Sequence, residues 1–363
     1  MASLHVVYEN LSPLDEADGK HGSCHLIEHM IGKAVDHPIA PILHENGIEN
    51  DYCVNYEMVY ASFTGTAKAL EKLAPIIVQE IVNSDADRFT QEDFESERSA
   101  VINEVEQMNA DAFQHTLSRA TLETYGLHGP EGVLEDIRAY TFDEFKKDYE
   151  RLVARPIRIV YVGPRKAKFP EIEFSGRTPF RQIVPCKSAW NMPEIPASGD
   201  DDEYNSIVFM GTEPVVGNRD YAAVLLATNM LAASDEALLL NQLRTKEGLV
   251  YGCAGSIGTF RNAGIPVFRT ATAARNTEKV MCCMSEVLEN PERYLTKDLF
   301  ERTRRYFGAI QKACHILRYS NCNDLVRKGM ITYEHDFRAI EYPEFIESVK
   351  NYLCQGKFRP FVG

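Results

Sequence analysis

The sequence of 363 residues lacks several features that would place it in a simple class. No apolar run reaches the roughly 18 residues that a transmembrane helix needs, and the start MASLHVVYENL lacks the basic and apolar regions of a secretory signal. Hydrophobic residues make up 44% and charged residues 25% of the chain, which excludes disordered and collagen-like proteins. We therefore expect a globular protein without a membrane partner, and the length predicts two domains.

The chain has fewer basic than acidic residues. The 39 Lys and Arg residues face 53 Asp and Glu residues, which gives a formal net charge of −14. This balance argues against nucleic acid as the main partner and permits peptide partners. The nine cysteines form no C-x-x-C pair, and Cys282 and Cys283 are simply adjacent. Reduced thiols are typical of the cytosol, so we expect a cytoplasmic protein.

Prolines are dense between residues 164 and 196, where six occur, and the acidic run 200–203 follows. Proline at this density opposes the interiors of helices and sheets. The sequence therefore predicts a first domain at 1–170, a proline-rich linker at 171–203 and a second domain at 204–363. Each domain is long enough to bury its own core.

The two halves also resemble each other. A block that starts a predicted helix in the first half recurs 206 residues later, with Thr90, Phe94, Glu95 and Arg98 matched by Thr296, Phe300, Glu301 and Arg304. This favours a duplicated unit, the alternative being two ordinary amphipathic helices that agree by chance. Strand-like runs separated by clusters of helical patterns predict an α+β fold. We expect two homologous domains, each a largely antiparallel sheet covered by helices.

The segment HGSCHLIEHMIGK carries the strongest chemical signal. His25, Glu28 and His29 form the pattern H-x-x-E-H, which is expected only about 0.03 times by chance in a chain of this composition. On a helix, the two histidines share a face and can bind one metal ion, with Glu28 beside its open position. The alternative is a helix with two surface histidines.

A catalytic zinc ion has three protein ligands and a water molecule, so a third ligand must come from elsewhere. The predicted helix ERSAVINEVEQMNAD places Glu97 and Glu104 two turns apart, on one face among apolar residues. A carboxylate on the apolar side of a helix is costly unless it is paired or bound to a metal. Glu106 lies off this face and is expected in solvent.

These motifs together resemble the inverted-zinc-motif metallopeptidases, the family of pitrilysin, insulinase and mitochondrial processing peptidase. The resemblance rests on H-x-x-E-H, an interval of seventy-four residues and the helix pattern E-R-x-x-V-x-x-E. In the second half, LRTKEGLVYGCAG is similar to the family signature L-R-x-x-x-G-L-x-Y. The resemblance covers nearly the whole chain, and it implies that the two domains form half of a clamshell chamber.

The resemblance implies a zinc site in the first half. His25, His29 and Glu104 would bind one Zn²⁺ per chain, Glu28 would be the general base, and Glu97 would orient a ligand or share protons. The second half has Thr303 and Ile310 at the positions of Glu97 and Glu104 and lacks H-x-x-E-H. We therefore expect one zinc site per chain.

Two further groups of residues follow from the resemblance. Arg244 and Tyr251 would stabilise the oxyanion of the reaction, although such residues are often only structural. An extended peptide substrate would add to an edge strand formed by Asn50, Asp51, Tyr52, Cys53 and Val54. The sequence departs from the family here, with Asn50-Asp51 in place of Asn-Ala and Ile31-Gly32-Lys33 after the metal helix. These departures leave the ligands intact and bear on substrate preference.

The sequence thus predicts a zinc endopeptidase or oligopeptidase that encloses peptides. The alternatives are a catalytically silent scaffold or assembly subunit and a peptide-binding regulator. Because enclosure takes four such domains in the family, the length also implies a homodimer, with Arg244 and Tyr251 of one subunit facing the zinc ligands of the other. A heterodimer with a related subunit is the alternative.

Overall fold

The computed structural model describes residues 1–8, 10–153, 158–164, 167–173, 185–186, 203–215, 218–233, 237–260, 263–317, 337–354 and 356–363. The chain divides into two compact units. Unit 1 comprises Met1–Gln107, His128–Phe180 and Lys312–Gly329, and unit 2 comprises Met108–Leu127, Arg181–Gln311 and Met330–Gly363. Most of the predicted linker, 171–203, lies outside the described residues, so the predicted linear boundaries stay a prediction.

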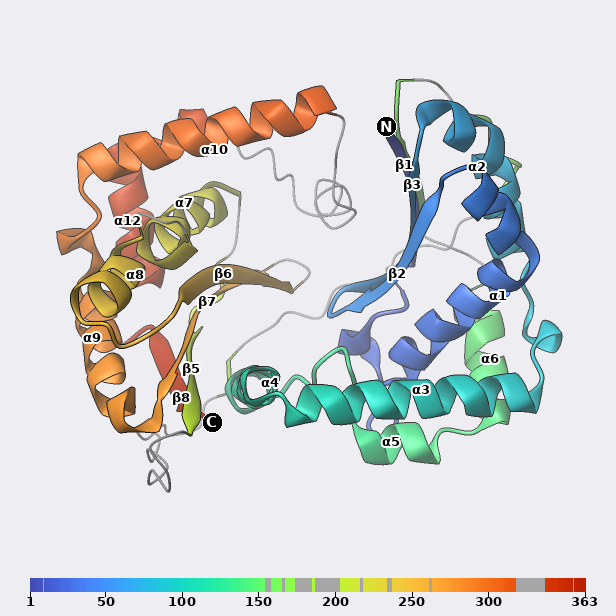
Figure 1. The fold of residues 1–363 in the computed structure, drawn as a ribbon, viewed down its shortest axis with the longest axis horizontal. Coiled ribbons are helices and arrows are strands. Elements are labelled where there is room, and N and C mark those ends of the chain that lie inside the picture. The colour runs from blue at the N-terminus through green and yellow to red at the C-terminus, as the bar shows by residue number, and fades with distance from the viewer. Residues whose placement is uncertain are drawn as a thin grey trace. The chain divides into compact units, whose positions relative to one another are not determined.

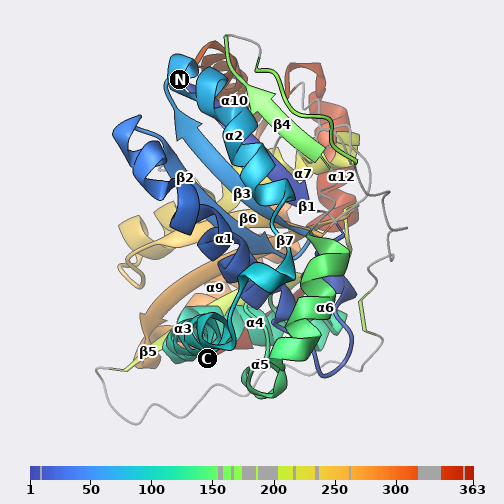
Figure 2. The same ribbon diagram turned by 90° about the vertical axis from the view of Figure 1, so that its right-hand side faces the viewer.

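Unit 1 is built on a four-stranded antiparallel sheet with the strand order β2-β3-β1-β4 (Figure 1 and Figure 2). Its strands are β1 (Ala2–Tyr8), β2 (Glu49–Asn55), β3 (Met58–Gly65) and β4 (Arg158–Val162). Alternate residues of β1, from Ala2 to Tyr8, point into the hydrophobic core. The long helices α1 (Ser23–Glu45) and α2 (Ala67–Val82) pack across this face of the sheet (Figure 2).

The other helices of this region are α3 (Gln91–Ala110), α5 (Leu134–Ala139) and α6 (Phe142–Leu152). A cluster of aromatic rings joins α3 to α6: Phe94 is fully buried, and its ring lies 5.6 Å from that of Phe142 and 5.5 Å from that of Phe145. Helix α6 begins with a capping box between Thr141 and Glu144, which satisfies its first backbone donors. The buried rings fix α3 against the core, and α3 carries both predicted glutamates.

Unit 2 repeats this arrangement. Its four-stranded antiparallel sheet has the order β6-β7-β5-β8. This is the order of the first sheet with four added to each strand number. The strands are β5 (Tyr204–Gly211), β6 (Cys253–Phe260), β7 (Ala263–Ala273) and β8 (Phe358–Val362). The helices are α7 (Asn218–Thr228), α8 (Leu238–Leu240), α9 (Thr277–Glu289), α10 (Lys297–Leu317) and α12 (Tyr342–Tyr352), of which α10 belongs to unit 2 up to Gln311. The predicted α+β class, with two homologous sheets covered by helices, is confirmed.

Helix α4 (Ala112–Tyr125) belongs to unit 2, although it lies between α3 and α5 in the sequence. Strand β5 is buried on both faces. Ile207 lies in the hydrophobic core, and the next residue, Val208, is buried on the opposite face of the sheet. Helix α4 packs against β5 and β8 there, with the Arg269 guanidinium 4.2 Å from the ring of Phe113. The second sheet is therefore covered on both faces by helices.

One stretch of unit 2 is unusually apolar. Between Arg219 and Lys246 the chain is long and apolar enough, by length and composition, to cross a membrane. However, 67% of its most apolar window is buried inside the protein, as in the core helix of a globular domain.

Candidate metal centre

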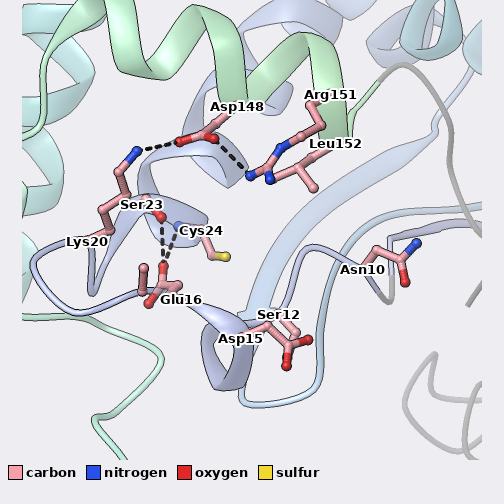
Figure 3. Close-up of a pocket in the computed structure, with 11 residues that line it drawn as sticks. Asn10, Ser12, Asp15, Glu16, Lys20, Ser23, Cys24, Asp148, Arg151 and Leu152 are labelled. Atoms are coloured by element: carbon pink, nitrogen blue, oxygen red, sulfur yellow. Dashed lines mark hydrogen bonds and ion pairs between the residues drawn. The ribbon is translucent and has the colours of Figure 1, made fainter. Parts of the chain in front are cut away.

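The histidine motif lies in the first two turns of α1, and the start of this helix is held by Glu16. The backbone N–H group of Gly22 donates to the Glu16 carboxylate at 3.0 Å. The Cys24 N–H donates to the same carboxylate at 2.7 Å and the Ser23 hydroxyl at 3.1 Å (Figure 3). Burial raises the pKa of Glu16 and outweighs the opposite effect of these donors. A carboxylate at this position serves as the cap that the helix itself lacks.

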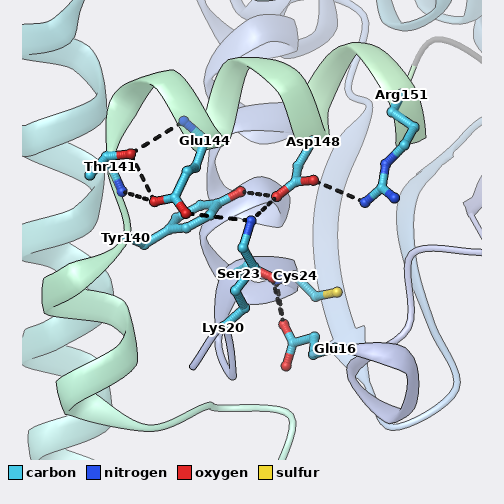
Figure 4. Close-up of polar contacts among 9 residues, drawn as sticks. All are labelled: Glu16, Lys20, Ser23, Cys24, Tyr140, Thr141, Glu144, Asp148 and Arg151. Atoms are coloured by element: carbon cyan, nitrogen blue, oxygen red, sulfur yellow. Dashed lines mark hydrogen bonds and ion pairs between the residues drawn. The ribbon is translucent and has the colours of Figure 1, made fainter. Parts of the chain in front are cut away.

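The segment before α1 is also tied to α6. Lys20 Nζ donates to Asp148 Oδ2 at 3.1 Å, Tyr140 donates to the same oxygen at 2.9 Å, and Arg151 donates to Oδ1 (Figure 4). A cavity of about 600 Å³ is lined by Glu16, Lys20, Asp148 and Arg151 among others, and the predicted metal ligands do not line it. These contacts fix the position from which α1 starts.

The structure brings the three predicted metal ligands together. His25 Nε2 and His29 Nε2 each lie 3.5 Å from the same oxygen, Oε2 of Glu104. Within the described residues, these three side chains form a group whose ligand atoms all lie within 4.8 Å of one another. Two histidine rings from α1 and one carboxylate from α3 thus converge on one point.

The separations fit the chemistry of a zinc ion. Ligands at 2.0–2.2 Å from a tetrahedral zinc lie about 3.4 Å from each other, and the two nitrogen–oxygen distances to Glu104 are 3.5 Å. Two imidazole nitrogens and a carboxylate form a known catalytic zinc donor set, which leaves a fourth position for water. His25, His29 and Glu104 are therefore the residues that would hold the ion.

A second layer of contacts orients both histidine rings. His25 Nδ1 lies 3.1 Å from the backbone oxygen of Glu131, and His29 Nδ1 lies 3.3 Å from Glu97 Oε2. Because a carbonyl and a carboxylate accept, both Nδ1 atoms donate, and the lone pair of each neutral ring lies on Nε2. Glu97 in turn accepts from Lys33 Nζ at 3.1 Å. Glu97 therefore lies where it can contact His29, and its orienting role stays a prediction.

Charge interactions across the centre shift the pKa values of two of the predicted ligands. Burial acts to lower the pKa of His25, but the contacts with Glu104 and the Glu131 carbonyl outweigh it, so the pKa is raised. When its ring is charged, His25 also donates from Nε2 to Glu104, which lowers the pKa of Glu104, and a charge on His29 adds to this effect. The pair therefore favours a charged carboxylate at the third ligand position.

Glu28, the predicted general base, lies beside this group. Its side chain is buried, and its Oε2 atom is 3.9 Å from His29 Nε2. Burial raises the pKa of Glu28 above its ordinary value, and the charges of Glu104 and Asp51 act in the same direction against the two histidines. A carboxyl group with a raised pKa accepts a proton more readily than an ordinary one.

The predicted substrate strand forms one edge of the sheet in unit 1. Strand β2, which contains Asn50, Asp51, Tyr52, Cys53 and Val54, pairs with β3 and ends the strand order. A cavity of about 440 Å³ lies between β2 and the centre, lined by Glu28, His29, Gly32, Lys33, Tyr52, Asp93 and Glu97. A Cβ atom on Gly32 would lie 3.2 Å from the Tyr52 ring, so this ring fits closely against the glycine.

Arg244 and Tyr251 lie near each other in unit 2. The Arg244 guanidinium is 5.0 Å from the centroid of the Tyr251 ring, and the tyrosine is 87% exposed. At this distance the guanidinium is attracted electrostatically to the face of the ring. Their predicted role at the metal centre of a second subunit stays a prediction.

Sequence reasoning did not identify several residues around the centre. Lys33 follows His29 by four residues, and Asp93 precedes Glu97 by four, so helical spacing was a usable signal for this ion-pair group. The carbonyl of Glu131 and the cap from Glu16 had no such signal, because their contacts depend on the paths of loops.

Comparisons with known proteins agree with this architecture. Residues 139–307 match the family model described as the peptidase M16 inactive domain, a region that begins after the candidate metal ligands. No curated protein matches the sequence.

Solved structures match over the whole length. A protease from Helicobacter pylori has a TM-score of 0.77 and 16% identity, and the match covers 99% of this chain and 93% of that one. A peptidase M16 inactive domain from Pseudomonas fluorescens has a TM-score of 0.77 and 16% identity, and the match covers 99% of this chain and 92% of that one. A chain of complex III2 from Candida albicans has a TM-score of 0.73 and 11% identity, and the match covers 99% of this chain and 90% of that one. The chain therefore has the two-domain fold of M16-like proteins and contains, in residues 139–307, a match to the M16 inactive domain.

Proposed function

We propose that this chain is a zinc-dependent metallopeptidase that hydrolyses peptides or unfolded segments. The observation that carries the proposal is the convergence of His25, His29 and Glu104 beside the buried carboxylate of Glu28. A structural ion-pair group would not need two rings whose Nδ1 atoms are both occupied and whose Nε2 atoms both face one carboxylate oxygen.

The proposed chemistry divides between the ion and the protein. When bound, Zn²⁺ supplies a Lewis acid that polarises the scissile carbonyl and lowers the pKa of water. Glu28 takes a proton from the water that attacks the carbonyl carbon, and it returns this proton to the amine as the C–N bond breaks. Glu97 keeps the His29 ring in place through its contact with Nδ1.

A peptide would reach Glu28 along strand β2. The β2 residues Asn50 to Val54 lie at a sheet edge and would pair with an extended backbone. This mode uses backbone hydrogen bonds, so it selects for unfolded or short substrates more than for a sequence. The cavity beside Tyr52 and Gly32 would receive a substrate side chain.

The test is zinc content together with hydrolysis of quenched fluorescent peptides. Glu28→Gln removes the base without touching a ligand, so this variant should bind one zinc ion per chain and lose cleavage. Glu106→Gln is the matched control, because Glu106 lies on the same helix as Glu104 but is half-exposed. Its partner is Arg138 of α5. Equal cleavage by wild type and Glu28→Gln would refute the mechanism.

We further propose a homodimer in which Arg244 and Tyr251 of one subunit serve the metal centre of the other. Mixing the two inactive variants Glu28→Gln and Arg244→Ala then regenerates one intact site in each mixed dimer. After subunit exchange this should restore about a quarter of the wild-type activity. An active monomer in gel filtration, or no recovery in mixed dimers that are shown to form, would refute the shared site.

The second candidate is a catalytically silent subunit that acts in assembly or holds peptides. The match of residues 139–307 to an inactive domain and the likeness to a chain of complex III2 support it. A wild-type chain that binds no zinc and hydrolyses no peptide would favour this function. Glu28→Gln would then change nothing, since there is no activity to lose.

A further inference from the structure

The first turn of α1 touches the backbone of the loop before α5. Gly22 and Gly132 both have left-handed backbone angles, with φ of 107° and 93°. A Cβ atom on Gly132 would lie 2.7 Å from Gly22 N and 2.8 Å from His21 O, and closer still to Gly22 Cα. Side chains other than hydrogen do not fit at this contact.

The same loop supplies the acceptor that orients a candidate metal ligand. Glu131 directly precedes Gly132, and its backbone oxygen lies 3.1 Å from His25 Nδ1. Because this acceptor belongs to the backbone, its position depends on the path of the loop. The Val133 N–H donates to His21 O at 3.0 Å and extends the contact by one residue.

The helix side of this contact has little freedom to move. The Glu16 carboxylate holds the N–H groups of Gly22 and Cys24, and the His21 N–H donates to Asp136 at 3.0 Å. A group inserted between Gly22 and Gly132 would therefore displace the loop and carry the Glu131 oxygen away from His25.

We propose that Gly132 is a positioning residue for the metal centre. Its contact with Gly22 keeps the Glu131 carbonyl on His25 Nδ1, which directs Nε2 toward Glu104. The inference rests on the proposed function only in taking zinc as the ion. Loss of an outer contact of this kind typically weakens metal binding by 10–100-fold.

The experiment compares zinc affinity, by competition with a chromophoric chelator, in wild type, Gly132→Ala and Gly47→Ala. Gly47 is the matched control, since it also has a left-handed φ, of 61°, but a Cβ atom there meets nothing within 4 Å. Gly132→Ala should bind zinc about 10–100-fold more weakly, and Gly47→Ala should bind like wild type. Equal affinity in a folded Gly132→Ala would overturn the inference and leave the proposed function standing, whereas a wild type that binds no zinc would overturn both.

A second measurement needs no variant and tests the contact on which the inference depends, even if Gly132→Ala does not fold. In the zinc-loaded wild-type chain labelled with ¹⁵N-histidine, the His25 Nδ1–H proton should exchange slowly with solvent, because a buried carbonyl accepts it. Assignment uses the loss of its signal in His25→Gln. A rapidly exchanging Nδ1–H would overturn the inference.

Discussion

A histidine outside the candidate metal centre should make the stability of unit 1 sensitive to acid. His5 lies in the central strand β1 and is 2% exposed. Its ring nitrogens contact two serine hydroxyls, with Nε2 at 3.1 Å from Ser3 and Nδ1 at 3.0 Å from Ser62. Burial lowers the pKa of His5 to about 4, from an ordinary value of 6.5.

The magnitude follows from the two pKa values. His5 binds a proton near pH 6.5 in the unfolded chain and only near pH 4 in the folded chain. Its contribution to the free energy of unfolding is therefore fully present above pH 6.5 and is lost as the pH drops toward 4. Between pH 7.5 and pH 5 the loss is about 2 kcal/mol, or roughly 30-fold in the equilibrium for opening the sheet. His5→Gln retains a polar side chain but does not titrate, so it should lose about 2 kcal/mol less than wild type over this interval.

The assay is hydrogen exchange of the β1 and β3 amides by mass spectrometry, corrected for intrinsic rates, in samples of equal zinc content. Local exchange reports the opening of this sheet separately from unit 2. The same drop in wild type and in His5→Gln would refute the reasoning. The variant also separates two causes of lost activity in acid: activity that survives at pH 5 only in His5→Gln would be limited by folding, and activity lost in both would reflect the site.

Three further predictions address the site and the core. Glu97→Gln should weaken zinc binding by about 10–100-fold in the chelator assay, because the charge that holds His29 Nδ1 is lost. Phe94→Ala should lower the stability of unit 1 by about 3–5 kcal/mol in calorimetry, since the ring is fully buried. Tyr149→Phe should cost about 1–2 kcal/mol by leaving the buried Ser84 hydroxyl without its 2.7 Å partner, and adding Ser84→Ala should recover most of this loss.

The parts of the fold that could be predicted are those in which local pattern and tertiary role agree. The β-branched and aromatic run of β3 becomes a strand, and the threonines at 90 and 296 precede the helices that they were expected to start. Strand β8 contains Pro360, which would oppose a sheet interior; the strand lies at the sheet edge, where proline is tolerated. Helix α1 runs on to Glu45 through Pro38 and Pro41, which the sequence gives no reason to expect.

The candidate site divides in the same way. The ligands could be predicted because two of them lie on one helix at a fixed spacing, and the third lies on a helix with a carboxylate on its apolar face. The Glu131 carbonyl and the Gly22–Gly132 contact could not, because a loop path that brings residues 22 and 132 together is set by the whole of unit 1. The membership of α4 in unit 2 had no sequence signal either, since an amphipathic pattern does not say which sheet the helix covers.

The duplication explains why the fold alone does not decide the function. In α3 the Arg98 guanidinium donates to Tyr140 O at 2.9 Å, and in α10 the matching Arg304 donates to Ile340 O at 3.0 Å. The contacts that hold the helix are therefore repeated, whereas Glu104 is matched by residue 310, an isoleucine. The repeated scaffold specifies where a ligand on this helix would lie but not whether one is present. A match of residues 139–307 to an inactive domain is consequently compatible with a metal centre built by residues 25–104, and the side chains there must decide the activity.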